Sequence, residues 1–313
     1  MRVFMNQCRA TVVFVAMMLS LGGGAQGGQK PVLPQLDHFE AVGLNIFVSV
    51  VVTNASGRST TADFIIDTGT TRTTIDVSIA DLLGLKPYAI TNNITPSGKT
   101  ARYTAFVSAI STLSQASAGL EVLVDDMSLY SIAYKRPVGG LLAIDFLKDY
   151  NLLVDFPHTR IGLLPSKSKL HGFGKLLTVD LTSENGLALM PITLPTGKTV
   201  SLIFDTGFDS LADALLFESQ VADLTLHPPI TTGTVQDVNG LQLVRIGIIP
   251  WLRIGKAYLK PAIVKVSEQP PPKMFSFPHG GMIGFFAFQR GVVAFNFSRH
   301  TLMVSAPLRA GLE

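Results

Sequence analysis

Phe64-Ile-Ile-Asp-Thr-Gly69 returns as Leu202-Ile-Phe-Asp-Thr-Gly207, 138 residues further along the chain. A second segment repeats in the same order, because Gly140-Leu-Leu-Ala143 returns as Gly281-Met-Ile-Gly284. Repetition at a nearly constant displacement is the sequence signature of an internal duplication. The chain is therefore predicted to consist of two halves of similar design, each with one Asp-Thr-Gly after an apolar stretch.

The apolar stretches predict an all-β architecture. They are short, rich in Val, Ile, Thr and Phe, and interrupted by Gly, Pro, Asn and Ser. Residues 54–57 and 195–197 each stand between two such stretches and are predicted hairpin turns. Only residues 77–85, with Asp76 as N-cap, and residues 211–224 have a helical pattern. The predicted strands include residues 46–53, 62–66, 120–124, 187–194, 200–204 and 292–297.

The composition excludes several classes of protein. Of 313 residues, 47% are hydrophobic and 15% are charged, which excludes an intrinsically disordered chain. The single cysteine, Cys8, rules out a disulfide framework and a cysteine-based zinc site. The six histidines show no metal-ligand spacing, and Lys and Arg are scattered at a net charge of +3. We therefore expect neither a metal nor a nucleic-acid partner.

The N-terminus has the pattern of a secretory signal peptide. Arg2 and Arg9 come first, an apolar run follows over residues 10–21, and small residues follow at 22–25. The run is shorter than the stretch of about 20 apolar residues that spans a bilayer. We expect residues 1–25 to be removed and the mature protein to be exported, periplasmic or secreted, without stable membrane insertion. An uncleaved anchor is the alternative.

The mature chain is predicted to divide where its composition changes. Residues 166–174 are rich in Ser, Lys and Gly and separate the two copies of the repeat. They are predicted to link an N-terminal lobe, residues 37–165, to a C-terminal lobe, residues 175–308. Residues 26–36 form a short segment ahead of the first lobe.

An aspartate at the end of an apolar strand needs a physical reason, because Asp is depleted in strands and desolvation of a carboxylate is unfavourable. Two similar lobes can bring Asp67 and Asp205 together, where the two carboxyl groups share one proton. Such a pair titrates as a unit and supplies one base and one acid at the same pH. This chemistry suits activation of water by one carboxylate while the other protonates a scissile carbonyl oxygen.

The residues beside each aspartate fit this chemistry. Gly69 and Gly207 allow close backbone approach and can donate N–H groups to the carboxylates. Thr68 and Thr206 can lock the two loops together through hydroxyl hydrogen bonds. The apolar strands behind the motifs would hold the pair rigid, as a preorganised site requires.

These residues resemble those of the aspartic peptidases, the pepsin-like and retropepsin-like clan. Residues 73–85 look like the helix that follows the motif in bacterial exported retropepsin-like proteins, and residues 140–147 with 150–156 are similar to their closing segment. The resemblance covers residues 40–305. It implies a bilobal acid-protease fold, two pseudo-symmetric β lobes with a cleft between them, and hydrolysis of peptide bonds without a cofactor.

The resemblance also implies flaps that close over the cleft. By position they would be residues 91–101 and 231–240, both of which are loop-like and contain Gly. Neither flap tip has a tyrosine, although Tyr103 lies just beyond the first. Thr70 would support the first aspartate loop. The candidate cleft residues are Pro96, Ser97, Gly98, Thr232 and Gly233.

The second copy departs from the family pattern. Phe208 cannot donate the hydrogen bond that a Ser or Thr would give there, so Asp205 would be held less firmly. Asp209 adds a second acidic group, which would raise the pKa values of the pair if it points inward. In the first closing segment, Ala143 stands where the family usually has Gly.

The sequence therefore predicts an aspartic endopeptidase whose partner is a polypeptide substrate and whose dyad is Asp67 and Asp205. A single chain with both motifs can be active as a monomer. The first alternative is a non-catalytic peptide-binding protein that retains the cleft but lost turnover through Phe208 and Asp209. The second is a site in which one Asp is used and a partner chain supplies the other. A Ser-His-Asp triad has no support, because no Gly-x-Ser-x-Gly is present.

Overall fold

The computed structural model describes residues 36–95, 98–168, 170, 173–208, 210–237, 240–269 and 279–305. These residues are predominantly β-structure, which confirms the all-β class. The expected signal peptide and residues 26–35 lie outside the described residues, as do Pro96, Ser97 and Asp209. Within the described part of the chain, no helix has both the length and the apolar character needed to cross a membrane.

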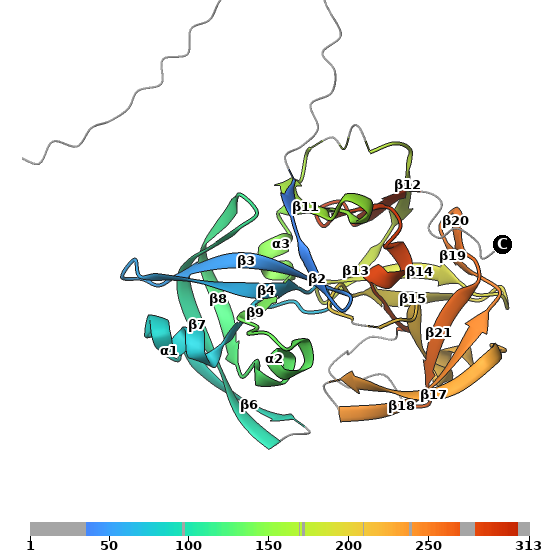
Figure 1. Ribbon diagram of the computed structural model, residues 1–313, viewed down its shortest axis with the longest axis horizontal. Coiled ribbons are helices and arrows are strands. Elements are labelled where there is room, and N and C mark those ends of the chain that lie inside the picture. Colours follow the sequence, from blue (N-terminus) through green and yellow to red (C-terminus); the bar gives the residue numbers. More distant parts are fainter. Residues whose placement is uncertain are drawn as a thin grey trace, which may run out of the picture. The chain divides into compact units, whose positions relative to one another are not determined.

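An eight-stranded sheet is built from the N-terminal half of the chain, in the order β2-β3-β4-β9-β5-β8-β7-β6 (Figure 1). The predicted hairpin turn joins β3 to β4, and Oδ1 of Asn54 accepts hydrogen bonds from the N–H groups of Ser56 and Arg58. The strands are β2 (Glu40–Val42), β3 (Asn45–Thr53), β4 (Ser59–Ile66), β5 (Thr74–Asp76), β6 (Ala89–Thr95), β7 (Gly98–Thr112), β8 (Gln115–Asp125) and β9 (Gly140–Leu142).

A ten-stranded sheet is built from the C-terminal half. Its order is β17-β18-β21-β16-β22-β15-β14-β19-β20, and β13 pairs with β14 (Figure 1). The second predicted hairpin turn closes with a hydrogen bond from the N–H of Leu194 to the carbonyl of Lys198. The strands are β13 (Thr182–Glu184), β14 (Leu187–Thr193), β15 (Thr199–Phe204), β16 (Ala214–Phe217), β17 (His227–Asp237), β18 (Gly240–Ile249), β19 (Leu252–Ile254), β20 (Ala257–Leu259), β21 (Ala262–Ser267) and β22 (Gly281–Ile283).

The two sheets repeat one pattern of pairing. In the first, β4 runs parallel to β9 with Phe64 opposite Gly140, and β9 is antiparallel to β5. In the second, β15 runs parallel to β22 with Leu202 opposite Gly281, and β22 is antiparallel to β16. The two copies of each sequence repeat therefore occupy equivalent strands. Strands β19 and β20 correspond to the end of β7 and the start of β8, because β19 pairs with β14 as the end of β7 pairs with β3.

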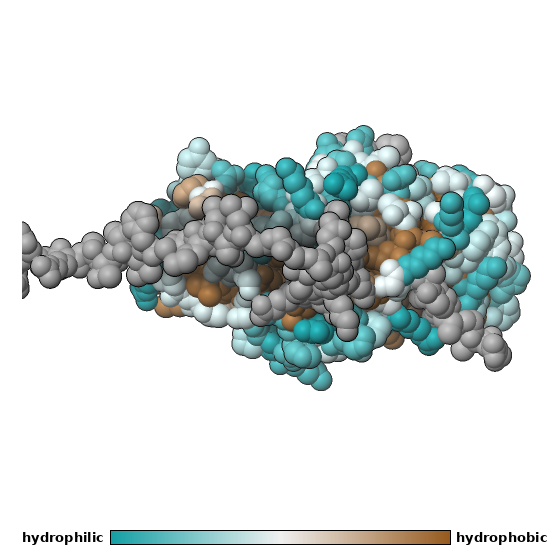
Figure 2. All heavy atoms as spheres, turned by 90° about the horizontal axis from the view of Figure 1, so that it is seen from above, coloured by the Kyte–Doolittle hydropathy of each residue, from teal (hydrophilic) through white to brown (hydrophobic). Residues whose placement is uncertain are grey.

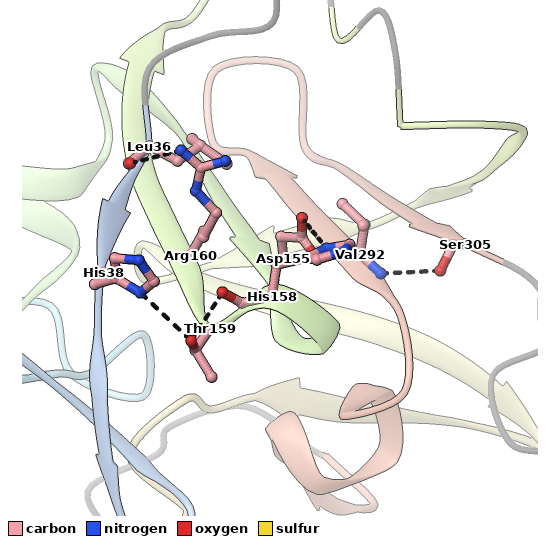
Figure 3. Close-up of polar contacts among 8 residues, drawn as sticks. All are labelled: Leu36, His38, Asp155, His158, Thr159, Arg160, Val292 and Ser305. Carbon is pink, nitrogen blue, oxygen red and sulfur yellow. Dashed lines mark hydrogen bonds and ion pairs between the residues drawn. The ribbon is translucent and has the colours of Figure 1, made fainter.

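A third sheet, of six strands, takes strands from both halves in the order β1-β11-β10-β23-β24-β12. Figure 3 shows polar contacts of this sheet and of the turn that follows β10. His158 Nδ1, in that turn, lies 2.9 Å from both carboxylate oxygens of Asp155, and the N–H of Val292 donates to Ser305 Oγ at 2.9 Å. The backbone pairing of β10 with β23 joins the two halves. The strands are β1 (Asp37–His38), β10 (Tyr150–Asp155), β11 (Arg160–Pro165), β12 (Leu176–Asp180), β23 (Val292–Asn296) and β24 (Thr301–Ser305).

The helices are short. Helix α1 (Val77–Leu83) begins at the predicted N-cap, where Asp76 Oδ1 accepts a hydrogen bond from the N–H of Ser78. It ends at Gly84, whose φ of 64° is left-handed and favours glycine. Helices α2 (Ser128–Tyr134) and α3 (Ile144–Leu147) were not expected from the sequence pattern. Two 3-10 turns, η1 (Phe156–His158) and η2 (Phe285–Phe288), precede the last strands of each half.

The helix predicted over residues 211–224 is wrong. Residues Ala214–Phe217 form strand β16, and only Glu218–Val221 form a helix, α4. All four residues of β16 are buried, between the parallel neighbour β21 and the antiparallel neighbour β22. A strand buried on both faces reads as a continuous apolar run, which periodicity alone does not distinguish from a buried helix.

The strands that lead to both aspartates lie in one hydrophobic core cluster. Phe64 and Ile66 of β4 and Phe204 of β15 are fully buried within it. The Phe204 ring makes edge-on contacts with the rings of Phe285, Phe288 and Phe295, at centroid distances between 5.4 and 6.0 Å. Close packing of this kind leaves the ends of β4 and β15 little freedom to move.

Candidate active site

Each Asp-Thr-Gly lies where a buried strand ends beside a parallel neighbour. The N–H of Asp67 donates to the carbonyl of Leu142, just past the pairing of β4 with β9, at 3.0 Å. The N–H of Asp205 donates to the carbonyl of Ile283 in the same way, also at 3.0 Å. The two aspartates are thus held at equivalent ends of the two sheets, and both residues are half-buried.

The two threonines connect the two aspartate loops by four crossed hydrogen bonds. The N–H of Thr68 donates to Thr206 Oγ1, and the N–H of Thr206 donates to Thr68 Oγ1, both at 3.0 Å. The Thr68 hydroxyl also donates to the carbonyl of Phe204 at 2.8 Å, and the Thr206 hydroxyl donates to that of Ile66 at 2.7 Å. Both threonines are buried. Neither loop can shift without breaking bonds to the other.

The two glycines face the carboxylates of the opposite loop. The N–H of Gly69 donates to Asp67 Oδ1, and the N–H of Gly207 donates to Asp205 Oδ1, both at 2.8 Å. A Cβ atom on Gly207 would lie 2.9 Å from Cγ of Asp67, and one on Gly69 would overlap the carboxyl group of Asp205. Only glycine leaves room for the two carboxyl groups to approach each other at these positions.

The geometry raises the pKa values of both carboxyl groups. Burial raises the pKa of Asp67, and this rise is partly offset by hydrogen bonds from Gly69, Asp205 and the Thr70 N–H, which lower it. Burial, followed by the negative charge of Asp67, raises the pKa of Asp205 well above its ordinary value. Because the pKa values of both carboxyl groups are raised and the Asp67 charge raises that of Asp205 further, the two groups share one proton and titrate as a unit.

The residue that follows each Asp-Thr-Gly contacts the aspartate of its own loop through a backbone N–H group. The N–H groups of Thr70 and Phe208 both lower the pKa of their own aspartate. The Phe208 side chain supplies no hydroxyl; it is 9% exposed and packs with Leu215 and Val244. The second loop is therefore anchored on its outer side by apolar packing instead of by a side-chain hydrogen bond.

A buried polar network braces the first aspartate loop. Asp145 accepts hydrogen bonds from the N–H of Thr73 at 2.9 Å and from its hydroxyl at 2.6 Å. The N–H of Ala143 donates to that hydroxyl oxygen at 3.2 Å, and the N–H of Ile144 donates to the Thr70 carbonyl. Sequence reasoning missed this role of Asp145 because nothing local to the segment 140–147 indicates a partner 72 residues away.

Tyr130 is a second residue that sequence reasoning missed. It lies on α2, and 40% of the residue is exposed. Desolvation of its hydroxyl group, together with the charges of Asp67 and Asp205, raises its pKa to about 12. Its hydroxyl is therefore a protonated donor within electrostatic range of the dyad. Tyr103, the tyrosine noted from sequence, lies in β7 and packs partly buried against the main core.

The two expected flap loops are instead β-hairpins. Strand β6 pairs with β7 in a continuous antiparallel register up to Thr95. Strand β17 pairs with β18 in the same way from Thr231 to Asp237, after a register shift between His227 and Thr231. Gly98 is the first residue of β7, while Thr232 and Gly233 lie in the body of β17, well before the turn. The β-branched residues in these stretches favour extended pairing over loop structure. The turn residues 96, 97, 238 and 239 lie outside the described part of the chain.

Apolar side chains reach the surface in several of these elements, and Figure 2 shows brown, apolar areas among the hydrophilic ones. Helix α2 has no buried residue and exposes Leu129 and Ile132 at 60% and 72%. Leu211, four residues after Gly207, is 73% exposed. Leu129 and Ile132 therefore give helix α2 an exposed apolar surface.

The chain was also compared with known proteins. No protein-family model matches it, and no curated protein sequence matches it.

Proposed function

We propose that this chain is an aspartic-type endopeptidase with a bilobal acid-protease fold, in which Asp67 and Asp205 hydrolyse peptide bonds. The observation that carries the proposal is the crossed arrangement of the two Asp-Thr-Gly loops. Each carboxyl group accepts the N–H of its own glycine and faces the glycine of the other loop, and the threonines bond the loops together. This is a carboxylate pair held for shared-proton chemistry.

The bilobal fold is supported by the repeated strand order of the two sheets and by the six-stranded sheet that takes strands from both halves. One lobe would be the N-terminal half and the other the C-terminal half, with one aspartate from each. A single chain then carries a complete dyad, so a monomer suffices for activity.

In the proposed mechanism, a water molecule lies between the ionised Asp67 and the protonated Asp205. The water oxygen attacks the scissile carbonyl carbon while Asp67 removes one proton from the water, and Asp205 donates its proton to the carbonyl oxygen. The resulting gem-diol collapses when the C–N bond breaks. The amine nitrogen then takes the proton from Asp67, and one diol hydroxyl returns a proton to Asp205. The products are a carboxylic acid and an amine, and the dyad regains its starting state.

The substrate would be an extended polypeptide. The β6–β7 and β17–β18 hairpins are the flaps in this proposal, and the exposed apolar residues on α2 and near Gly207 provide apolar contact surface. Localisation outside the cytoplasm, after removal of residues 1–25, belongs to the same proposal and rests on the N-terminal sequence pattern.

A peptide-binding protein without turnover is the second candidate, and the observation that favours it is Phe208, which gives Asp205 no hydroxyl partner. Incubation of the purified protein with a mixed peptide library, from about pH 3 to about pH 7, separates the two candidates. Mass spectrometry in ¹⁸O-labelled water should reveal new C-termini that carry the label. Retention of library peptides with no cleavage at any pH would favour the binding protein and contradict the peptidase.

A further inference from the structure

Asn45 is a buried polar residue that contacts the second aspartate loop from the first half of the chain. It is the first residue of β3 and is 1% exposed. With its amide oriented to satisfy its neighbours, Nδ2 donates to the carbonyls of Thr206 at 3.1 Å and Gly207 at 3.3 Å. Its Oδ1 accepts a hydrogen bond from the hydroxyl of Tyr134.

These bonds complete the hydrogen bonding of the loop that carries Asp205. The N–H of Thr206 is bonded to Thr68 Oγ1 and the N–H of Gly207 to Asp205 Oδ1. The two carbonyls are bonded to Asn45. Every backbone polar group of Thr206 and Gly207 thus has a partner, and the first half of the chain supplies all but one of these partners. A shift of this loop would leave buried backbone groups without partners, so the bonds restrain it.

Tyr134 extends the contact to helix α2. Its ring packs edge-on against Phe47 at a centroid distance of 5.5 Å, which fixes the position of the hydroxyl. The same helix carries Tyr130, whose hydroxyl lies within electrostatic range of both carboxylates. A continuous chain of contacts therefore runs from α2 through Tyr134 and Asn45 to the backbone beside Asp205.

We propose that Asn45 is a positioning residue that holds the Asp205 loop in its catalytic geometry and couples it to α2. The inference deepens the proposed peptidase function and rests on it for its kinetic consequence. The Phe208 side chain provides the loop with apolar packing only, so the amide of Asn45 adds a polar restraint on the two carbonyls beside Asp205. A displacement of about 1 Å in such a loop lowers turnover on the order of 10²-fold, because the reacting groups lose alignment.

The test compares Asn45→Leu with Asn151→Leu, a matched control. Asn151 is also fully buried, and its Nδ2 also donates to two consecutive carbonyls, those of Pro165 and Ser166, in the six-stranded sheet. Hydrogen–deuterium exchange is read on peptides covering residues 205–208 and 67–70. In Asn45→Leu we expect exchange at 205–208 to be about tenfold to hundredfold faster than in the parent, with a much smaller change at 67–70. Asn151→Leu should leave both peptides unchanged.

The kinetic readout uses whichever peptide the parent cleaves. Asn45→Leu should lower kcat strongly with little change in KM, because the substrate-binding surface is intact and only the dyad is displaced. Tyr134→Phe keeps the fold and frees the amide to rotate, so it should give a smaller change of the same kind. Equal exchange rates at 205–208 in Tyr134→Phe, Asn45→Leu and Asn151→Leu overturn the inference. If Asn45→Leu does not fold, the exchange rate at 205–208 in Tyr134→Phe is compared with that of the parent, and equal rates overturn the inference.

The exchange readout is independent of the proposed function. If the parent cleaves no peptide, faster exchange at 205–208 in the Asn45 and Tyr134 variants still establishes the restraint, and only the peptidase proposal fails. If the parent cleaves peptides but exchange and kcat are unchanged in both variants, the peptidase proposal stands and the role of Asn45 is refuted.

Discussion

Replacement of Thr68 by valine should destabilise the protein far more than a surface threonine substitution of the same kind. The Thr68 side chain is 0% exposed. Its hydroxyl donates to the carbonyl of Phe204 at 2.8 Å and accepts the N–H of Thr206 at 3.0 Å. Valine has nearly the same shape but makes neither bond, so two backbone groups are left buried without a partner.

The expected cost follows from these two groups. A buried polar group that loses its partner costs about 1–3 kcal/mol, so Thr68→Val should lower the free energy of unfolding by about 2–6 kcal/mol. Thr68→Ser keeps the hydroxyl and loses one methyl group, for a cost of about 1 kcal/mol. Thr53→Val is the surface control, because the Thr53 hydroxyl bonds to that of Ser59 in an exposed pair, and should change stability by less than about 0.5 kcal/mol.

Guanidinium chloride unfolding of the parent and the three variants measures the difference, with the midpoint as the primary readout. The order of midpoints should be parent and Thr53→Val, then Thr68→Ser, then Thr68→Val. If Thr68→Val and Thr68→Ser unfold at the same midpoint, the crossed hydroxyl bonds do not hold the two loops together and the reasoning is refuted.

Three further predictions concern the dyad and the C-terminal half. The raised pKa of Asp205 means that the folded state favours its protonated form, and the stability that this form contributes is lost as pH rises through the folded pKa. Asp205→Asn should therefore be more stable than the parent near neutral pH, by a margin that shrinks in acid, and thermal unfolding across pH measures the difference. His279 is 2% exposed and burial lowers its pKa, so stability should fall as pH drops below about 6.5, the ordinary pKa of His, and His279→Asn should lose that part of the pH dependence in the same scans. Gly69→Ala would place a Cβ on the Asp205 carboxyl group and should abolish peptide cleavage, whereas Gly57→Ala, at an open turn position with a φ of 83°, should cost only about 1 kcal/mol and leave cleavage intact.

Much of the fold could be predicted from the sequence because its signals are local. The apolar stretches became strands, Asn54 and residues 195–197 became hairpin turns, and Asp76 capped a helix. Strand β16 could not be predicted, since a fully buried strand lacks the alternation that marks a half-buried one.

The residues of the candidate site that belong to the repeated Asp-Thr-Gly motif could be predicted from the sequence. The residues that act through distant partners could not. Asp67, Asp205 and their glycines could be found from the duplication alone. Asn45, Tyr134 and Asp145 could not, because each acts through a residue more than 70 positions away and no spacing rule links them. Buried polar contacts between distant segments depend on the tertiary arrangement, which one sequence does not reveal.

The central claim is that the two carboxyl groups act as one catalytic unit on a peptide bond. The most direct test is kcat/KM for a peptide that the parent cleaves, compared with Asp67→Asn and Asp205→Asn under the same conditions. Both variants should remain folded, and each should lose activity on the order of 10⁴-fold or more, because neither an acid nor a base works alone in this mechanism. Full activity in Asp205→Asn, or in Asp67→Asn, would contradict the account.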